Sequence, residues 1–269
     1  MKRSIYLVTL LAFLLRLGLG FGAYSLLPQV GYASKPQQAG YLFFDAYRRD
    51  KQAWELAQSS KPLLRAFDEK FSSDQYGGML WISAFVYRYL SGGTQQPMLM
   101  VLLAALIGSL GVFFVYLTTK RLADEKTAMI SASIFAFFPE AILLGASQMR
   151  EPFLMTFIAM AFYGLTGWQA AGRKTAWLWM LFALAGMLLV SPGFVALTLV
   201  ASAGWWYFSR PSAESGGRSK FPWQAAAVAL GIFVLALVVL AASWDSLVAV
   251  KGGGLVGVLA NWARGTARW

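Results

Sequence analysis

Long apolar blocks recur along the chain, and short polar connections separate most of them. A run of about 20 predominantly apolar residues crosses the hydrocarbon core of a bilayer as one helix, so blocks of this length predict transmembrane spans. The predicted spans are residues 5–27, 97–119, 127–147, 153–169, 176–190, 193–208 and 223–243. We therefore expect an all-α fold, a polytopic bundle of about seven spans that forms one membrane domain over residues 1–269.

A more polar stretch, residues 28–96, separates the first two predicted spans and is expected to form an extracytoplasmic loop. Part of it has the pattern of an amphipathic helix at the membrane interface, with apolar residues at roughly helical spacing and charged residues on other faces. The apolar positions are Phe43, Phe44, Tyr47, Trp54 and Ala57, and the charged ones are Arg48, Arg49, Lys51 and Glu55. LLRAFDEKF repeats the pattern, and GGMLWISAFVYRYLSGG is too short for a full span, which favours a surface-lying or partly inserted helix.

The distribution of Lys and Arg over the short connections predicts the orientation of the chain. Three connections are rich in these residues, which marks them as cytoplasmic, whereas ASQMREP and VSPG carry a single Arg between them. The basic positions are Lys120, Arg121, Lys126, Arg173, Lys174, Arg210, Arg218 and Lys220. We expect a multi-pass protein of the plasma membrane with a cytoplasmic N-terminus. Residues 244–269 would then form an extracytoplasmic tail, and its lack of an obvious stop favours the N-terminal part of a longer protein.

Composition agrees with a membrane protein and narrows its chemistry. Of the residues, 58% are hydrophobic and 13% are charged, whereas soluble domains carry about 25% charged residues. The net charge of +11 does not indicate a nucleic-acid partner, because much of the excess lies in the short loops that orient spans. The chain has no Cys and no His, which excludes thiol and imidazole catalysis and metal sites built on these residues. Nucleotide-binding fingerprints are also absent.

Arg16 interrupts the apolar core of the first block and counts against a cleavable signal peptide, which is the alternative to a first span. Insertion of an Arg at the centre of a membrane costs about 2.5–3.5 kcal/mol, so Arg16 is expected to face protein or a polar cavity. Two interpretations remain open: a contact to an anionic substrate group, or an internal ion pair or snorkelling side chain.

Asp45 follows an aromatic cluster at the predicted membrane edge, in YLFFDAYRRD. A carboxylate in this position could take a proton from an acceptor hydroxyl, as a general base does. The alternative is an ordinary surface carboxylate that pairs with Arg48 or Arg49, which lie three and four residues further along the helix. Tyr47, on the predicted apolar face, is a candidate for substrate binding.

Arg150 and Glu151 lie in the outer connection ASQMREP. Pro152 suits the first turn of the next helix, and Glu151 suits the positive end of that helix dipole, which is a complete structural explanation. The functional alternative places both residues in one outer cavity with Asp45, where Arg150 could meet a phosphate. Glu140, in FFPEA, would line that cavity or cap a helix.

Three acids late in the first loop raise the question of a metal site. Asp68, Glu69 and Asp74 could hold a divalent ion, but Arg65 and Lys70 nearby favour a solvated, self-compensating face. We therefore expect no cofactor, with a divalent cation as the less favoured alternative.

Several features together resemble the N-terminal half of a GT-C type membrane glycosyltransferase, of the dolichyl-phosphate-mannose protein mannosyltransferase and aminoarabinose transferase group. These are LLRLGLG in the first span, FFDAYRRD and DQYGGMLWISAFVYRYLSGG in the first loop, KRLADEKTA at a cytoplasmic turn, and FFPEAILLGAS followed by REPF. The resemblance covers roughly residues 5–210 and depends on the order and spacing of these segments. Relatives usually have more spans and often a soluble C-terminal domain.

The resemblance implies a hexosyl- or pentosyltransferase that moves a sugar from a polyprenyl-phosphate-linked donor to an unknown acceptor at the outer face of the membrane. Asp45 would deprotonate or orient the acceptor, Glu151 would correspond to the second-loop acid of some relatives, and Arg150 could contact the lipid phosphate. The family's paired acids are not adjacent to Asp45, which argues against a metal. Two further classes stay open, a flippase-like transporter of lipid or polysaccharide and a non-catalytic membrane subunit.

Overall fold

The structure, a computed structural model, describes residues 2–30, 34–67, 77–171 and 175–209. All regular secondary structure in these ranges is helical, so the all-α prediction is confirmed for this part of the chain. Two compact units, Met1–Val195 and Ala196–Trp269, make up the chain. All candidate site residues belong to the first unit.

Two described helices are long and apolar enough to cross a membrane, and a bent pair could make a third span. The two are α1, Lys2–Val30, and α5, Pro97–Leu122; the bent pair is α6, Glu125–Phe137, with α7, Pro139–Gly145. Three more helices follow: α8, Glu151–Ala171, α9, Ala176–Val190, and α10, Pro192–Phe208. The predicted number of seven spans is thus not confirmed, and the predicted span 223–243 lies outside the described residues.

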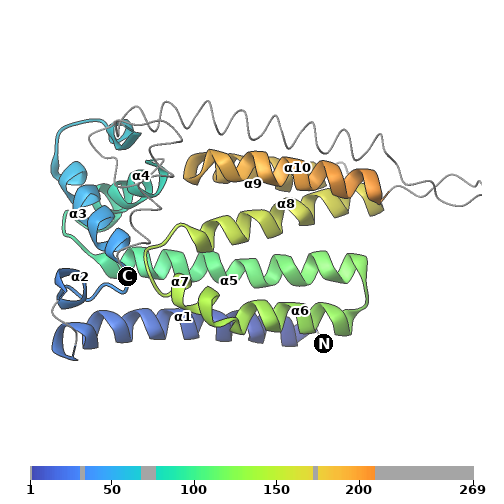
Figure 1. The fold of residues 1–269 in the computed structure, drawn as a ribbon, viewed down its shortest axis with the longest axis horizontal. Helices are drawn as coiled ribbons and strands as arrows, with labels where there is room; N and C mark the ends of the chain where they lie inside the picture. Colours follow the sequence, from blue (N-terminus) through green and yellow to red (C-terminus); the bar gives the residue numbers. More distant parts are fainter. Residues whose placement is uncertain (1, 31–33, 68–76, 172–174, 210–269) are drawn as a thin grey trace, which may run out of the picture. The chain divides into compact units, whose positions relative to one another are not determined.

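Helix α5 lies at the centre of the first unit, where α1, α6 and α8 pack against it and α9 packs against α8 (Figure 1). Small residues permit the close approaches between helices. A Cβ added to Gly164 of α8 would lie 2.7 Å from the backbone nitrogen of Met180 in α9. A side chain at this position would therefore force the two helices apart.

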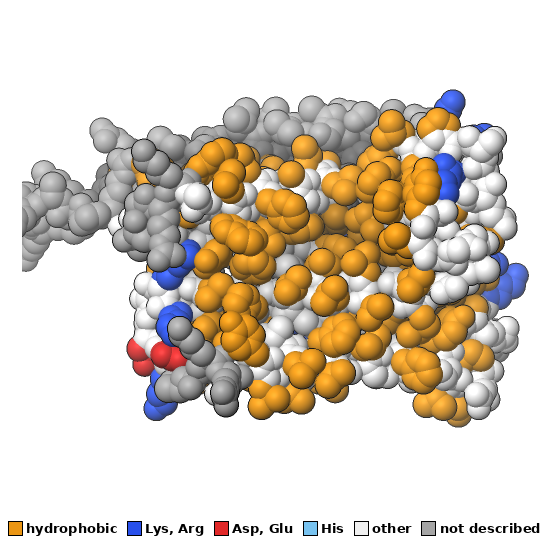
Figure 2. Space-filling model, turned by 180° about the vertical axis from the view of Figure 1, so that it is seen from behind, with side chains coloured by type: hydrophobic (Ala, Val, Ile, Leu, Met, Phe, Trp, Pro, Cys, Tyr) orange, Lys and Arg blue, Asp and Glu red, His pale blue; other side chains and the backbone are white. Residues whose placement is uncertain are grey.

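The outer surface of the bundle is apolar. Figure 2 shows one face on which hydrophobic side chains form a broad band, with Lys and Arg gathered toward its two ends. On α1 the side chains of Leu7, Leu10 and Leu14 are each more than half exposed, as is Ile134 on α6. Contiguous exposed apolar surface on this scale marks contact with lipid or with another apolar surface. The chain is therefore a membrane protein.

The predicted single span over 127–147 is broken. Pro139 has no backbone N–H to donate, and α6 and α7 meet there at 55°. The guanidinium of Arg16 lies at this break, where its Nη1 donates to the carbonyls of Ala136 at 3.2 Å and Ala12 at 3.0 Å. Arg16 thus satisfies a carbonyl at the end of α6, where helical carbonyls lack partners of their own.

Short helices follow α1. They are α2, Lys35–Gln38; α3, Phe44–Gln58; the 3₁₀ turn η1, Leu63–Phe67; α4, Gly78–Phe85; and the π-helical turn η3, Val86–Leu90. The helices predicted in the loop are found, although DEKF of LLRAFDEKF and the acids Asp68, Glu69 and Asp74 lie outside the described residues. Helix α4 and η3 together are too short to cross a membrane, which agrees with the short helix expected there.

The buried face of α3 differs from the predicted one. The buried residues are Ala46, Arg49, Asp50, Ala53 and Leu56. Phe44, expected on the apolar face, is 60% exposed, and Arg49, expected on a solvent face, is 4% exposed. The aromatic residues suggested one stripe, but two alanines and a leucine define the packed stripe, and this brings two charged residues into the protein.

Candidate functional site

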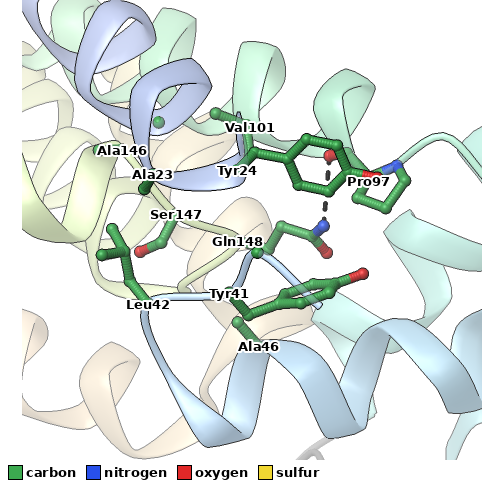
Figure 3. Close-up of a pocket in the computed structure, with 12 residues that line it drawn as sticks. Ala23, Tyr24, Tyr41, Leu42, Ala46, Pro97, Val101, Ala146, Ser147 and Gln148 are labelled. Carbon is green, nitrogen blue, oxygen red and sulfur yellow. Dashed lines mark hydrogen bonds between the residues drawn. The ribbon is translucent and has the colours of Figure 1, made fainter. Parts of the chain in front are cut away.

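A small pocket lies where the end of α1, the segment before α3, the start of α5 and the α7–α8 loop meet (Figure 3). It is lined by Gly20, Ala23, Tyr24, Gly40, Tyr41, Leu42, Ala46, Pro97, Val101, Ala146, Ser147 and Gln148. The cavity measures about 20 Å³, room for about one water molecule. Its lining includes Ala46, next to Asp45, and Gln148, two residues before Arg150.

Asp50 is the centre of a buried polar network beside this pocket. Its carboxylate is fully buried and accepts three hydrogen bonds from neutral groups. The hydroxyl of Tyr41 donates to Oδ2 at 2.7 Å, that of Tyr87 donates to Oδ1, and the amide of Gln95 donates to Oδ2 at 2.5 Å. These contacts join α3 to the preceding segment, to η3 and to the turn before α5. Hydrogen bonds to an ionised group are stronger than neutral ones, so the network fixes α3 firmly.

The same network raises the pKa of both tyrosines. Burial is the largest cause for Tyr41 and for Tyr87, and the nearby negative charge of Asp50 together with the hydrogen bond to it raises each pKa further. Both phenols therefore stay protonated and keep donating to Asp50 well beyond neutral pH.

A second connection joins α3 to the α7–α8 loop. Nη1 of Arg49 donates to the backbone carbonyl of Gln148 at 2.6 Å, and the side-chain amide of Gln148 donates to the carbonyl of Pro97 at 3.2 Å. Figure 3 shows the Gln148 side chain between the rings of Tyr24 and Tyr41. Both Arg49 and Gln148 are buried, so water does not compete for the two hydrogen bonds that join the loop to α3 and to α5.

Asp45 lies in the first turn of α3, one turn before Arg49, and its side chain is exposed. The N-terminus of a helix favours negative charge, and no side chain caps the start of α3. An exposed carboxylate at this position can reach a group outside the protein. The alternative, an ordinary surface carboxylate that pairs with Arg48 or Arg49, stays a prediction.

Arg150 and Glu151 lie at the start of α8, at the end of the loop that Arg49 holds. Nε of Arg150 and Oε1 of Glu151 are 3.4 Å apart, and both side chains are about one-third exposed or less. The other carboxylate oxygen of Glu151 is buried and has no hydrogen-bond partner among the described residues. Glu151 is in the first turn of α8 with Pro152 next to it, so the structural explanation given by the sequence also applies.

The remaining predicted residues have different surroundings. Tyr47 packs edge-to-face against Tyr41 with ring centroids 5.3 Å apart, and Lys51 lies over its ring. Glu140 is exposed in the first turn of α7. Arg16 is 1% exposed and hydrogen-bonded to two carbonyls, an internal arrangement in which no carboxylate takes part among the described contacts. Its role as an anion contact stays a prediction.

The described residues contain no group of three or more acidic side chains that could hold a metal ion. The absence of a cofactor stays an expectation.

Sequence reasoning did not identify Asp50, Gln148, Tyr87 and Arg49 as parts of one network. The sequence does carry a signal for Arg49 and Asp50. Ala46, Asp50 and Ala53 recur at helical spacing, which places residues 49 and 50 on the packed face of α3. Two of the three partners of Asp50 come from 37 and 45 positions further along the chain, and no local pattern indicates them.

Together the apolar bundle, the buried polar network and the charged residues beside the pocket define a membrane protein with a polar site at one end of its helices. The chain belongs to the dolichyl-phosphate-mannose-protein mannosyltransferase family, whose model matches residues 78–239, more than half of the chain. It is thus a membrane glycosyltransferase of the GT-C type, and the resemblance seen in the sequence is confirmed.

The matched region contains Gln148, Arg150 and Glu151 but begins after Arg16, Asp45 and Tyr47. No curated protein and no solved structure matches the chain. The roles of the residues in α1 and α3 therefore depend on the geometry described above.

Proposed function

We propose that the protein transfers a sugar from a polyprenyl-phosphate-linked donor to an acceptor at the outer face of the plasma membrane. The observation that carries the proposal is the hydrogen bond from Arg49 to the carbonyl of Gln148. It joins the helix of Asp45 to the loop of Arg150, so an acidic and a basic side chain lie at the same end of the bundle. The family membership supports the type of donor.

Asp45 acts as the base in this reaction. The acceptor oxygen forms a bond to the anomeric carbon of the sugar while its proton passes to the carboxylate of Asp45. The bond between that carbon and the phosphate oxygen breaks, and the electron pair leaves with the polyprenyl phosphate. The exposure of Asp45 in the first turn of α3 suits this role, because an acceptor can approach it from outside.

Arg150 stabilises the leaving phosphate. Negative charge increases on the phosphate as the bond breaks, and a guanidinium is suited to bind it through two parallel hydrogen bonds. Glu151, with its Oε1 3.4 Å from Nε of Arg150, orients that side chain. Tyr47 and Glu140 would contact the acceptor or the sugar, and the reaction needs no metal ion.

The orientation follows from the same arrangement. Lys120 and Arg121 lie in the last turn of α5, and the pocket includes Pro97 at the first turn of that helix. If the basic end of α5 faces the cytoplasm, the pocket and Asp45 face outward. A cytoplasmic N-terminus fits this orientation, because α1 also contributes residues near its C-terminal end, such as Tyr24, to the pocket.

The test is sugar transfer by the purified protein in proteoliposomes, with a panel of polyprenyl-phosphate-linked hexoses and pentoses as donors and membrane extract as the source of acceptor. Asp45→Asn should reduce transfer by about 10²–10⁴-fold, the usual contribution of a general base. Glu55→Gln is the matched control, since Glu55 is also an acid of α3 outside its buried face, and it should leave transfer unchanged. Full activity of Asp45→Asn would remove the assignment of the base.

A further inference from the structure

We propose that Arg49 and Gln148 are positioning residues that hold the α7–α8 loop, and with it Arg150 and Glu151, in register with Asp45. This inference rests on the proposed function. It adds that the two halves of the site belong to different helices, and that the bonds made by Arg49 and Gln148, here named the Arg49–Gln148 clamp, align them.

The first half of the clamp is Arg49. Its side chain is only 4% exposed, and its Nη1 donates to the carbonyl of Gln148 at 2.6 Å. Burying an arginine is costly, so its hydrogen bonds must be maintained for the fold to tolerate it. The bond spans 99 positions of the sequence and ends two residues before Arg150.

The second half is Gln148. Its side-chain amide donates to the carbonyl of Pro97 at the start of α5, so the loop is attached both to α3 and to the central helix. Within the loop between α7 and α8, the Met149 N–H donates to the Ser147 carbonyl at 2.8 Å, and the Ser147 hydroxyl donates to two carbonyls of α7. The clamp therefore ties this loop to two elements that lie far from it in the sequence, α3 and the start of α5.

Asp50, the neighbour of Arg49, prevents α3 from turning. Its three donors come from the segment before α3, from η3 and from the turn before α5, so they fix the rotation of the helix about its axis. With α3 held in this way, the position of Arg49 determines where the loop lies relative to Asp45. Reactions that join two bound groups are sensitive to small displacements, and a shift of about 1 Å can cost about 10²-fold in rate.

The first measurement reports how accessible the α7–α8 loop is to a thiol reagent. The chain has no cysteine, so Ser147→Cys introduces a single thiol, at a position that is 5% exposed. With Arg49→Met added, the thiol should react with a maleimide at least about tenfold faster, because the loop loses its attachment to α3. Arg49→Lys, which keeps the positive charge and an N–H group that can donate but loses the planar fork of the guanidinium, should restore part of the protection.

The second measurement is kinetic, in the cysteine-free protein. Arg49→Met should lower kcat for sugar transfer by about 10–100-fold while KM for the polyprenyl-phosphate-linked donor changes by less than about threefold, because alignment is lost but the binding groups remain. Gln148→Leu should behave in the same way, since it removes the attachment to Pro97.

Arg88→Met is the matched control. Arg88 also lies against α3 and donates to backbone carbonyls, but at the opposite end of the helix. Arg88→Met should lower thermal stability. Both kcat and the labelling rate of the thiol introduced at position 147 should stay near the values of the protein that retains Arg88.

The inference is overturned if Arg49→Met leaves the thiol at position 147 protected, or if Arg49→Met and Arg88→Met alter stability, labelling and kcat alike, which would indicate a general structural role. The labelling result does not depend on catalysis. If Asp45→Asn retains activity, the proposed function fails, while faster labelling at position 147 in Arg49→Met would still establish the clamp.

Discussion

The hydroxyl of Tyr41 donates to Oδ2 of Asp50 over 2.7 Å, which closes the segment before α3 onto the buried face of that helix. Tyr41 also lines the pocket, whereas Asp50 is fully buried and does not. The buried carboxylate thus holds in place a side chain that lines the pocket. Helix α3 thus carries a buried acid, Asp50, five residues after the exposed Asp45. Substitution of Asp50 should lower stability, whereas substitution of Asp45 should lower activity and leave stability nearly unchanged.

Asp50→Ala is expected to destabilise the protein by about 1–3 kcal/mol, because it leaves buried donors without an acceptor. Asp45→Asn, at an exposed position, should change the free energy of unfolding by less than about 0.5 kcal/mol. Thermal or denaturant unfolding of the detergent-solubilised protein measures both. Equal effects of the two substitutions would contradict the assignment of a structural and a reactive acid.

Stability should fall with rising pH in the alkaline range. The pKa values of Tyr41 and Tyr87 are raised in the folded protein by burial and by Asp50, whereas a tyrosine in the unfolded chain titrates near about pH 10. Below that pH both states hold the phenolic proton and these residues add no pH dependence. Above it the unfolded state loses protons that the folded state keeps, so unfolding becomes more favourable.

Comparison of two phenylalanine variants tests this alkaline effect. Tyr87→Phe should reduce the loss of stability above about pH 10, since it removes one of the two titrating groups. Tyr89→Phe is the control, because Tyr89 is 61% exposed and lies in the same turn, and it should leave the pH dependence as in the wild type. Identical pH profiles for both variants would contradict the burial of the Tyr87 proton.

The side chain of Arg16 packs against Gly145, where the missing Cβ leaves room for it. A Cβ on Gly145 would lie 2.6 Å from Cδ of Arg16, so Gly145→Ala should displace the guanidinium from the carbonyl of Ala136. We expect destabilisation by about 1–3 kcal/mol, as for other overpacked sites. Gly18→Ala is the control in the same bundle, where a Cβ meets nothing within 4 Å, and it should be neutral or stabilising.

Sugar transfer is expected to be independent of divalent cations. The proposed reaction uses Asp45 and Arg150, and no cluster of acids suited to a metal occurs among the described residues. Dialysis against EDTA should leave the rate of transfer within about twofold of the untreated protein. A loss that Mn²⁺ or Mg²⁺ restores would show that acids outside the described part of the chain take part.

Some elements could be predicted from the sequence because one local property determines them. Helices α1 and α5 follow from long apolar runs, broken in α1 by Arg16, and α9 begins and ends where predicted, at Ala176 and Val190. The bend at Pro139 comes from the missing N–H of that residue, although the sequence was interpreted as one span.

The buried network could not be predicted in the same way. The aromatic residues of α3 suggested a packed face, yet Phe44 is exposed and Ala46 and Ala53 pack, because small residues allow α3 to approach its neighbours closely. The pairing of Asp50 with Tyr87 depends on how α3 and η3 meet, which is a tertiary property. The candidate residues Asp45, Arg150 and Glu151 were chosen from local context, and their roles stay predictions.

The most direct test of the central claim is the distance between positions 45 and 150 in the membrane-embedded protein. Since the chain has no cysteine, spin labels can be attached to Asp45→Cys with Arg150→Cys and to the reference pair Glu55→Cys with Arg150→Cys. Positions 45 and 55 are about 15 Å apart along α3, so the two pairs are distinguishable. We expect a shorter distance from position 150 to position 45 than from position 150 to position 55; the reverse order would contradict a shared site for the acid and the arginine.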